Sequence, residues 1–377
     1  MNMRRLAAVA RKEFLHVIRD PRSVILAIAL PMTMLLLFGY ALTLDVDHVP
    51  MVVWDQSRTP QSREYLSTFT LSRYFDIVSY VTSYREVERA IDKREALVAV
   101  VIPSDFAQGL ARGSVVPVQA IVDGSDPNTA TLAMGYARLA TLIYSQQVTV
   151  SMLQRRGIDA PETPVDSRPR VWFNTDMESR NFIIPGLIAV IMMVIAALLT
   201  SLAVSREWER GTMEQLIATP VKGTELIVGK MIPYFCIGIL DVVIAMLMGQ
   251  FLFGVPLRGS PALALLFSSV FLIGALGMGI TISVVTKNQL LSTQMAMLST
   301  YLPSFLLSGY LFPIANMPKV IQLVTYVVPA KYFIVIIRNV YLKGLGPEIM
   351  LLDILLLCVF AVVIVSIAAK AFKKKLD

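Results

Sequence analysis

Charged residues and cysteines are scarce in this sequence. Of its 377 residues only 16% are Asp, Glu, Lys or Arg, whereas 55% are hydrophobic. That balance is too apolar for an ordinary soluble protein. The two cysteines, Cys236 and Cys358, both lie within apolar runs, so they cannot form the disulfide framework of a soluble domain. Cysteine content therefore gives no information on the redox compartment.

Motifs for catalysis, metal binding and ATP binding are also missing from the sequence. The two histidines, His16 and His48, fit no metal-ligand spacing. The nearest approach to a phosphate-binding loop has five residues rather than four between Gly223 and Gly229, and Met231 stands where a Ser or Thr would hold magnesium. We therefore expect no catalytic residue, metal or cofactor in this chain. Any ATP energy must come from a partner that binds ATP and magnesium.

The hydrophobic residues are concentrated in runs of about 20, long enough to cross a bilayer core of roughly 30 Å as helices. The predicted fold is therefore an α-helical integral membrane protein, with six transmembrane helices and one α/β extracytoplasmic domain. The six apolar runs cover residues 24–44, 182–204, 227–253, 262–285, 290–312 and 348–369.

The long polar stretch between the first two runs, residues 45–181, has the pattern of an α/β domain. Short β-branched segments alternate with helical segments along it. Ser83 and Glu86 form a capping-box pattern at the start of one helix, and Pro127 predicts the first turn of a long helix that ends near Arg155. A stretch of this length can bury a core of its own.

Residues 1–23 have the pattern of an amphipathic helix that lies in the headgroup layer on the cytoplasmic side. A secretory signal peptide is the alternative, but the apolar run is too long and no small-residue cleavage site follows Tyr40 cleanly. The predicted apolar face of the helix consists of Leu6, Val9, Ala10, Phe14, Val17 and Ile18.

Residues 313–346 are apolar enough to suggest a seventh span, but Pro329, Lys331 and Arg338 interrupt them. Seven spans would also place the basic tail, residues 371–377, outside the cell, against the positive-inside rule. We therefore predict two re-entrant half-helices here, dipping in from the outer face against protein. Both termini are then cytoplasmic and the α/β domain is outside. Transmembrane helices two to six lie within residues 182–370. The same rule explains the net charge of +7 without nucleic acid.

A short charged segment, residues 205–231, separates the second and third apolar runs on the predicted cytoplasmic side. On a helical wheel Glu207, Arg210 and Glu214 form one face, in which neighbouring charges have opposite signs. A helix lying on the bilayer and a helix docked on a partner protein explain the segment equally well. The apolar patch beside this face consists of Met213, Leu216 and Ile217.

Asp241 lies in the middle of the third apolar run. A central Asp costs about 2.5–3.5 kcal/mol, and each central Leu, Ile, Phe or Val offsets roughly 0.3–0.6 kcal/mol of that cost. An intramembrane carboxylate marks either a translocation path or subunit seam, or a local pair with neighbouring helices. Asp241 is therefore the candidate residue for a translocation path, with local pairing as the open alternative.

The charged segment carries a family resemblance, and shorter similarities occur at residues 11–21 and 307–333. Together they resemble permeases of the ABC-2 type, the type-2 ABC exporters, in the subgroup with a large extracytoplasmic domain between spans one and two. The residues of the charged segment that carry the resemblance are Arg206, Glu207, Glu209, Arg210, Gly211, Thr212, Met213, Glu214, Gln215, Leu216, Thr219, Pro220, Glu225, Leu226, Gly229 and Lys230.

The resemblance implies a permease subunit in the cell inner membrane that exports drug-like or amphiphilic cargo. Separate ABC ATPase subunits would supply the energy, a second permease subunit would complete the path, and a periplasmic adaptor is a further implied partner. Residues 205–219 would be the coupling helix and residues 1–23 the connecting helix. A membrane-anchored extracytoplasmic sensor or scaffold is the alternative, although anchoring needs one or two spans. The implied ATPase-coupling residues are Glu207, Arg210, Gly211, Thr212, Met213, Glu214, Gln215 and Leu216.

Overall fold

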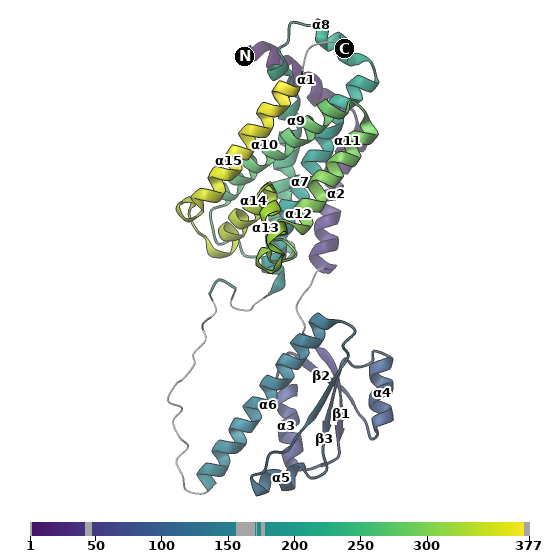
Figure 1. Ribbon diagram of the computed structural model, residues 1–377, viewed down its shortest axis with the longest axis vertical. Coiled ribbons are helices and arrows are strands. Elements are labelled where there is room, and N and C mark those ends of the chain that lie inside the picture. Colours follow the sequence, from purple (N-terminus) through teal and green to yellow (C-terminus); the bar gives the residue numbers. More distant parts are fainter. Residues whose placement is uncertain (1, 42–46, 156–169, 171, 175–177, 373–377) are drawn as a thin grey trace. The chain divides into compact units, whose positions relative to one another are not determined.

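The computed structural model describes residues 2–41, 47–155, 170, 172–174 and 178–372. The chain divides into two compact units (Figure 1). One unit comprises Met1–Thr43 with Arg170–Asp377, and the other comprises Leu44–Pro169. Most of the predicted basic tail, residues 373–377, lies outside the described residues.

The smaller unit is a four-stranded sheet with helices on both faces (Figure 1). The strand order is β2-β1-β3-β4, in which β1 pairs in parallel with β2 and β3, and β4 pairs antiparallel with β3. The predicted α/β domain is thus confirmed. Its elements are β1 (Val49–Asp55), α3 (Pro60–Thr70), β2 (Phe75–Tyr80), α4 (Tyr84–Asp92), β3 (Val98–Ile102), α5 (Phe106–Arg112), β4 (Gln119–Val122) and α6 (Pro127–Arg155).

Two apolar clusters cover the two faces of this sheet. On one face the rings of Tyr65 on α3 and Tyr144 on α6 lie 5.2 Å apart, centroid to centroid, among buried strand residues. On the other face Val87 of α4 is buried against the sheet. Because β1 and β3 contribute buried residues to both clusters, these two strands are short apolar runs in the sequence rather than alternating ones.

The larger unit is helical. Its first two helices are α1 (Met3–Ile18) and α2 (Pro21–Ala41). The others follow the α/β unit in the chain: α7 (Ser179–Glu209), α8 (Thr212–Ala218), α9 (Gly223–Leu247), α10 (Pro261–Thr286), α11 (Gln289–Ala296), α12 (Leu302–Leu306), α13 (Lys319–Thr325), α14 (Pro329–Arg338) and α15 (Leu351–Ala371). Single π-helical turns extend α9, link α11 to α12 and extend α14, at Met248–Leu252, Met297–Tyr301 and Asn339–Lys343.

Four helices of the described part are long and apolar enough to cross a membrane, or up to five if a bent pair counts as one span. The four contain α7, α9, α10 and α15, and the bent pair joins α13 to α14 at an angle of 80° within the predicted re-entrant region. The six predicted spans therefore stay a prediction. The described apolar part of α2 is the short stretch Ala27–Ala41. The run at 290–312 is helical only to Leu306.

α7 is the central helix of this unit. In its most apolar window 83% of the residues are buried, against 17% for the C-terminal helix that contains α15. α7 also packs very closely on α10, because a Cβ at Gly279 would lie 2.4 Å from the carbonyl oxygen of Ala197. Glycine permits this approach of two backbones. Nearby, the hydroxyl of Thr200 donates to the carbonyl oxygen of Leu276 at 3.0 Å.

Candidate functional site

The predicted coupling segment is not one continuous helix. α7 continues to Glu209, the chain turns at Gly211 with a φ of 70°, and α8 begins at Thr212. A left-handed residue cannot continue an α-helix, and glycine adopts that conformation without strain. Glu207 therefore lies on α7 and Glu214 on α8. The predicted single charged face is wrong, because the helical wheel assumed an unbroken helix.

α8 has one buried side and one exposed side. Met213 is 0% exposed and Leu216 is half-buried against the helical core, so these two side chains anchor α8. The side chain of Ile217, the third member of the predicted patch, lies outside the described part. The predicted coupling residues that are exposed are Arg210, Gly211, Thr212, Glu214 and Gln215.

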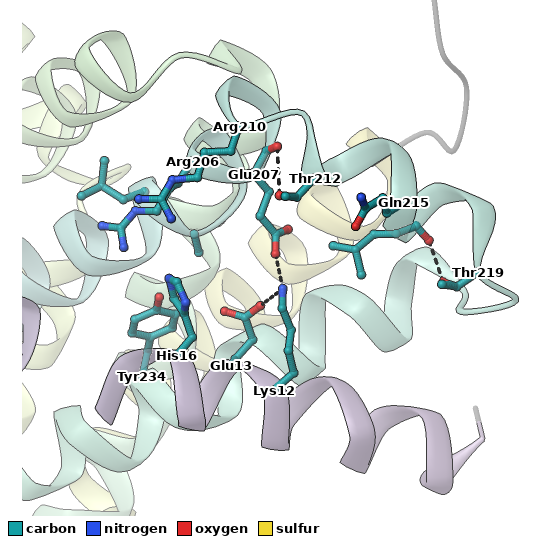
Figure 2. Close-up of a pocket in the computed structure, with 13 residues that line it drawn as sticks. Lys12, Glu13, His16, Arg206, Glu207, Arg210, Thr212, Gln215, Thr219 and Tyr234 are labelled. Atoms are coloured by element: carbon teal, nitrogen blue, oxygen red, sulfur yellow. Dashed lines mark hydrogen bonds and ion pairs between the residues drawn. The ribbon is translucent and has the colours of Figure 1, made fainter. Parts of the chain in front are cut away.

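Glu207 is buried within a group of four charged side chains, here called the ion cluster: Lys12, Glu13, Glu207 and Lys230. Nζ of Lys230 lies 3.0 Å from Oε1 of Glu13 and 2.8 Å from Oε2 of Glu207. Figure 2 shows Lys12 between the same two carboxylates, 3.0 Å from Glu13 and in direct contact with Glu207. Two positive and two negative charges therefore offset one another, which buried charges require.

The pKa values of the α1 members follow from this arrangement. Burial raises the pKa of Glu13, but the ammonium groups of Lys230 and Lys12 outweigh burial and leave that pKa below its ordinary value. Burial lowers the pKa of Lys12, but the carboxylates of Glu207 and Glu13 outweigh burial and leave that pKa above its ordinary value. Both shifts favour the charged forms. Glu13 and Lys12 are therefore both ionised at neutral pH.

α1 lies directly against α9. A Cβ at Gly229 would lie 2.7 Å from Cγ1 of Val9, so the two helices can approach this closely only because glycine has no side chain. The N-cap of α1 is also tied to α9, because the backbone N–H of Asn2 donates to Oε1 of Glu225 at 2.6 Å.

The buried face of α1 differs from the predicted one. It consists of Leu6, Val9, Glu13 and Val17. Phe14 and Ile18, which were predicted on the apolar face, are 46% and 57% exposed. The prediction turned one face of six apolar residues towards the headgroup layer. In the structure the face packed on protein takes in three of these six together with the charged Glu13, and it leaves Phe14 and Ile18 outside.

The end of α7 also contacts the start of α11. The backbone N–H of Gln289 donates to Oε1 of Glu209 at 2.8 Å. The ammonium of Lys287 lies 4.5 Å from the centroid of the Trp208 ring. The predicted cytoplasmic loop at 286–289 and the coupling segment thus form one surface.

A cavity of about 440 Å³ lies between α1, α7, α8 and α9 (Figure 2). Its wall carries charges of both signs, including Arg210 and Glu207, together with the polar Gln215 of α8. No group of three or more His, Cys, Asp or Glu side chains suited to a metal ion occurs among the described residues. Because most of its lining residues are polar or charged, this cavity is here called the polar recess beside α8.

Asp241 is separate from the ion cluster. It is 7% exposed on α9, and neither carboxylate oxygen has a hydrogen-bond partner among the described residues. It lines a cavity of about 20 Å³ enclosed by α2, α7, α9 and α10. The structure does not bring it together with the predicted coupling residues.

Residues 21–370 match the family described as ABC-2 family transporter protein. The chain belongs to this family. It is 38% identical to the probable multidrug ABC transporter permease YbhS of Escherichia coli K12, over 100% of this chain and 99% of the relative. It is 28% identical to the probable multidrug ABC transporter permease YbhR of the same organism, over 98% and 99%. The linearmycin resistance permease protein LnrN of Bacillus subtilis is 20% identical, over 88% and 89%.

This ABC-2 permease is therefore a membrane permease subunit of an ABC exporter, which confirms the predicted family and class of function. Lys12, Glu13 and Lys230 were missed as site residues. Lys230 stands inside the apolar run at 227–253, and an ionisable residue in such a run needs a partner of opposite charge. That signal predicts a paired lysine, but it does not identify Glu13 and Glu207 as the partners.

Proposed function

We propose that this ABC-2 permease exports drug-like or amphiphilic molecules across the cytoplasmic membrane. Separate ABC ATPase subunits bind ATP and magnesium and supply the energy. Two relatives that match nearly the whole chain are named as multidrug ABC transporter permeases, which supports this class of cargo. The apolar helices support a multi-pass membrane location.

α8 is the surface on which the ATPase docks in this proposal. The observation that carries this proposal is that one side of α8 is buried and the other is exposed: Met213 is fully buried, whereas Glu214 is exposed. A short helix held by an apolar anchor presents its charged side in a fixed geometry. Motion imposed on α8 reaches the end of α7 across the turn at Gly211. It is passed on to α1 and α9 there, because Glu207 of α7 pairs with Lys12 and Lys230.

The membrane arrangement completes the proposal. Six spans place both termini in the cytoplasm and residues 45–181 outside, with the bent α13–α14 pair as a re-entrant element at the outer face. A second permease subunit, identical or closely related, forms the other half of the path. A periplasmic adaptor binds the external domain in this arrangement. The exposed Phe14 and Ile18 of α1 face the headgroup layer, as an interfacial helix requires.

The test uses Glu214→Lys in the full-length chain, expressed in cells that lack the native gene. We expect the variant to reach the membrane in normal amounts. The amount of ATPase that copurifies with it should be at least about tenfold lower than for the wild type, and efflux of an amphiphilic dye should be lost. Glu348→Lys is the matched control, since Glu348 is an exposed carboxylate in the turn before α15, and it should export normally.

Two results would overturn the proposal. One is the absence of any ATPase from the purified wild-type complex. The other is unchanged efflux by the Glu214→Lys variant. A chain that binds a ligand through its external domain but moves none would instead be a membrane-anchored sensor.

A further inference from the structure

Three cavities adjoin one another along α7 and α9. The polar recess beside α8 shares four lining residues, among them Arg206 and Leu202, with a second cavity of about 220 Å³. The second cavity shares Ile195, Leu199 and Tyr234 with the small cavity that contains Asp241. Tyr234 lines all three cavities. The series therefore leads from the coupling surface to a buried carboxylate.

The second cavity is walled mainly by aliphatic side chains of α2, α7 and α9, such as Leu30, Leu198 and Ile237. An apolar cavity of about 150 Å³ is enough to hold a benzene ring. A cavity of about 220 Å³ can therefore hold an apolar body larger than one ring. Its polar lining residues include Arg206 and Asp20, whose charged groups lie 3.6 Å apart.

The small cavity is also mostly apolar, but it contains one carboxylate, that of Asp241. Apart from Asp241 and Tyr234, aliphatic side chains, Pro31 and Gly238 line it. Its volume of about 20 Å³ suits a single water-sized group, since a cavity needs about 10–15 Å³ to hold one water. Gly238 allows α10 to close it, because a Cβ there would lie 2.7 Å from Cδ2 of Leu272.

A buried carboxylate requires a nearby cation or hydrogen bonds, and the described residues supply neither to Asp241. Both oxygens of Asp241 are without a hydrogen-bond partner among the described residues. The residue lies on the face of α9 that also carries Tyr234 and Gly238, and this face lines the cavity within one chain. A ligand with an ammonium group and an apolar body would fit both cavities: the ammonium group would pair with Asp241 in the small cavity, and the apolar body would fill the second cavity.

We propose that this pair of cavities is a binding site for organic monocations with an apolar, ring-sized body, in which the ammonium group pairs with Asp241. The inference rests on the proposed export function and deepens it by assigning a cargo class to one site. The lining of both cavities comes from α1, α2, α7, α9, α10 and α11 of this chain. Arg206 lies where the second cavity meets the polar recess, and cargo enters from there in this proposal.

The test measures binding to the full-length chain in lipid nanodiscs by equilibrium dialysis. The probes are 1-naphthylmethylammonium and the neutral 1-naphthylmethanol, which have the same ring and nearly the same shape. Empty nanodiscs correct for partition into lipid. We expect the wild type to bind the ammonium compound at least about tenfold more tightly than the alcohol, and Asp241→Asn to bind the two equally.

Asp353→Asn is the matched control, because Asp353 is a carboxylate of α15 that lines neither cavity, and it should keep the wild-type preference. Ile195→Phe, which fills the junction of the two cavities, should weaken binding of both probes. Equal affinities in the wild type would overturn the proposal, even if Asp241→Asn failed to fold. A preference for the ammonium compound that survives Asp241→Asn would overturn it as well.

The two proposals fail separately. Binding in nanodiscs needs no ATPase, so a negative result leaves the efflux test of Glu214→Lys unaffected. Conversely, if binding depends on Asp241 but the protein shows no ATP-driven efflux, the binding site stands and the proposed export function fails.

Discussion

Lys230 of α9 and Glu13 of α1 form an ion pair of 3.0 Å, although 217 positions separate them in the chain. Lys230 is fully buried, and its ammonium also contacts Glu207 of α7 at 2.8 Å and the carbonyl oxygen of Ala203 at 3.0 Å. One lysine thus joins the amphipathic helix α1 to the helix that leads into α8. Buried pairs of this kind contribute little net free energy when intact, but breaking one is costly.

Replacing Lys230 with methionine should destabilise the protein strongly. The change leaves Glu13 and Glu207 buried with only Lys12 as a partner, and removing one member of a buried pair typically costs about 3–5 kcal/mol. Thermal unfolding of the purified full-length chain in detergent measures the effect. Protease sensitivity near the N-terminus should rise in the same variant, because α1 loses its main polar contact.

The control for this prediction is Lys370→Met, since Lys370 is exposed near the end of α15. It should leave the unfolding midpoint unchanged within error. A stable Lys230→Met variant with a protected N-terminus would show that apolar packing alone holds α1.

Gly229→Ala should displace α1 from α9. The added methyl group would lie 2.7 and 2.9 Å from side-chain atoms of Val9, which is too close for carbon atoms in contact. Overpacking of this kind typically costs about 1–3 kcal/mol. The double variant Gly229→Ala with Val9→Ala should recover part of the loss, because Val9 is the obstructing side chain. Gly135→Ala is the contrast.

Gly135 lies within α6 with no atom near the added Cβ, so alanine there should stabilise the helix by up to about 1 kcal/mol. If Val9→Ala gave no recovery in the Gly229→Ala background, the contact between α1 and α9 would not be the cause.

Acidification should loosen α1. The pKa of Glu13 is below its ordinary value of 4.5 in the folded protein, so its contribution to stability is complete above 4.5 and is lost as the pH falls towards the folded-state pKa. The midpoint of thermal unfolding should therefore decrease in this acid range. Glu13→Gln cannot titrate, and the decrease should be smaller in that variant than in the wild type. Equal slopes for the two proteins would contradict the assignment.

Arg338→Lys should weaken the packing of α14 on α7. The guanidinium of Arg338 donates to three carbonyl oxygens, those of Phe182 at 3.2 Å, Gly309 at 3.1 Å and Tyr310 at 3.2 Å. A lysine ammonium cannot reproduce this planar fork. The bonds to Gly309 and Tyr310 are partly buried and the bond to Phe182 is exposed, so the loss should come mainly from the first two, at up to about 1–3 kcal/mol each. Unfolding midpoints should show the loss. Arg258→Lys, at an exposed arginine, is the control and should have no effect.

Local patterns predicted the α/β unit well. The predicted cap of α4 is present, since the hydroxyl of Ser83 accepts from the backbone N–H of Glu86 at 3.3 Å. The reciprocal bond of the capping box goes to a neighbour instead, because the carboxylate of Glu86 accepts from the backbone N–H of Thr82 at 2.7 Å. The predicted long helix from Pro127 to Arg155 has those bounds in the structure. Capping signals act over a few residues, so the sequence can reveal them.

The candidate site was less predictable. The sequence located the charged segment, but a helical wheel placed Glu207 and Glu214 on one face, and the turn at Gly211 separates them. A glycine in a helical pattern can be tolerated within the helix or can end it, so the pattern did not decide between one helix and two. The number of spans also stays a prediction, since the runs at 24–44 and 290–312 correspond to shorter described helices.

The sequence by itself determined the membrane character, the α/β insertion and the position of the charged segment between two apolar helices. Hydropathy and periodicity decide these features, because they depend on neighbouring residues and on the thickness of the bilayer. Only the tertiary structure decided that Lys230 pairs with Glu13 and Glu207, whereas Asp241 faces a cavity and has no hydrogen-bond partner in the described part of the chain. A buried charge in one apolar helix depends on what the other helices bring to it, and that depends on packing between distant parts of the chain.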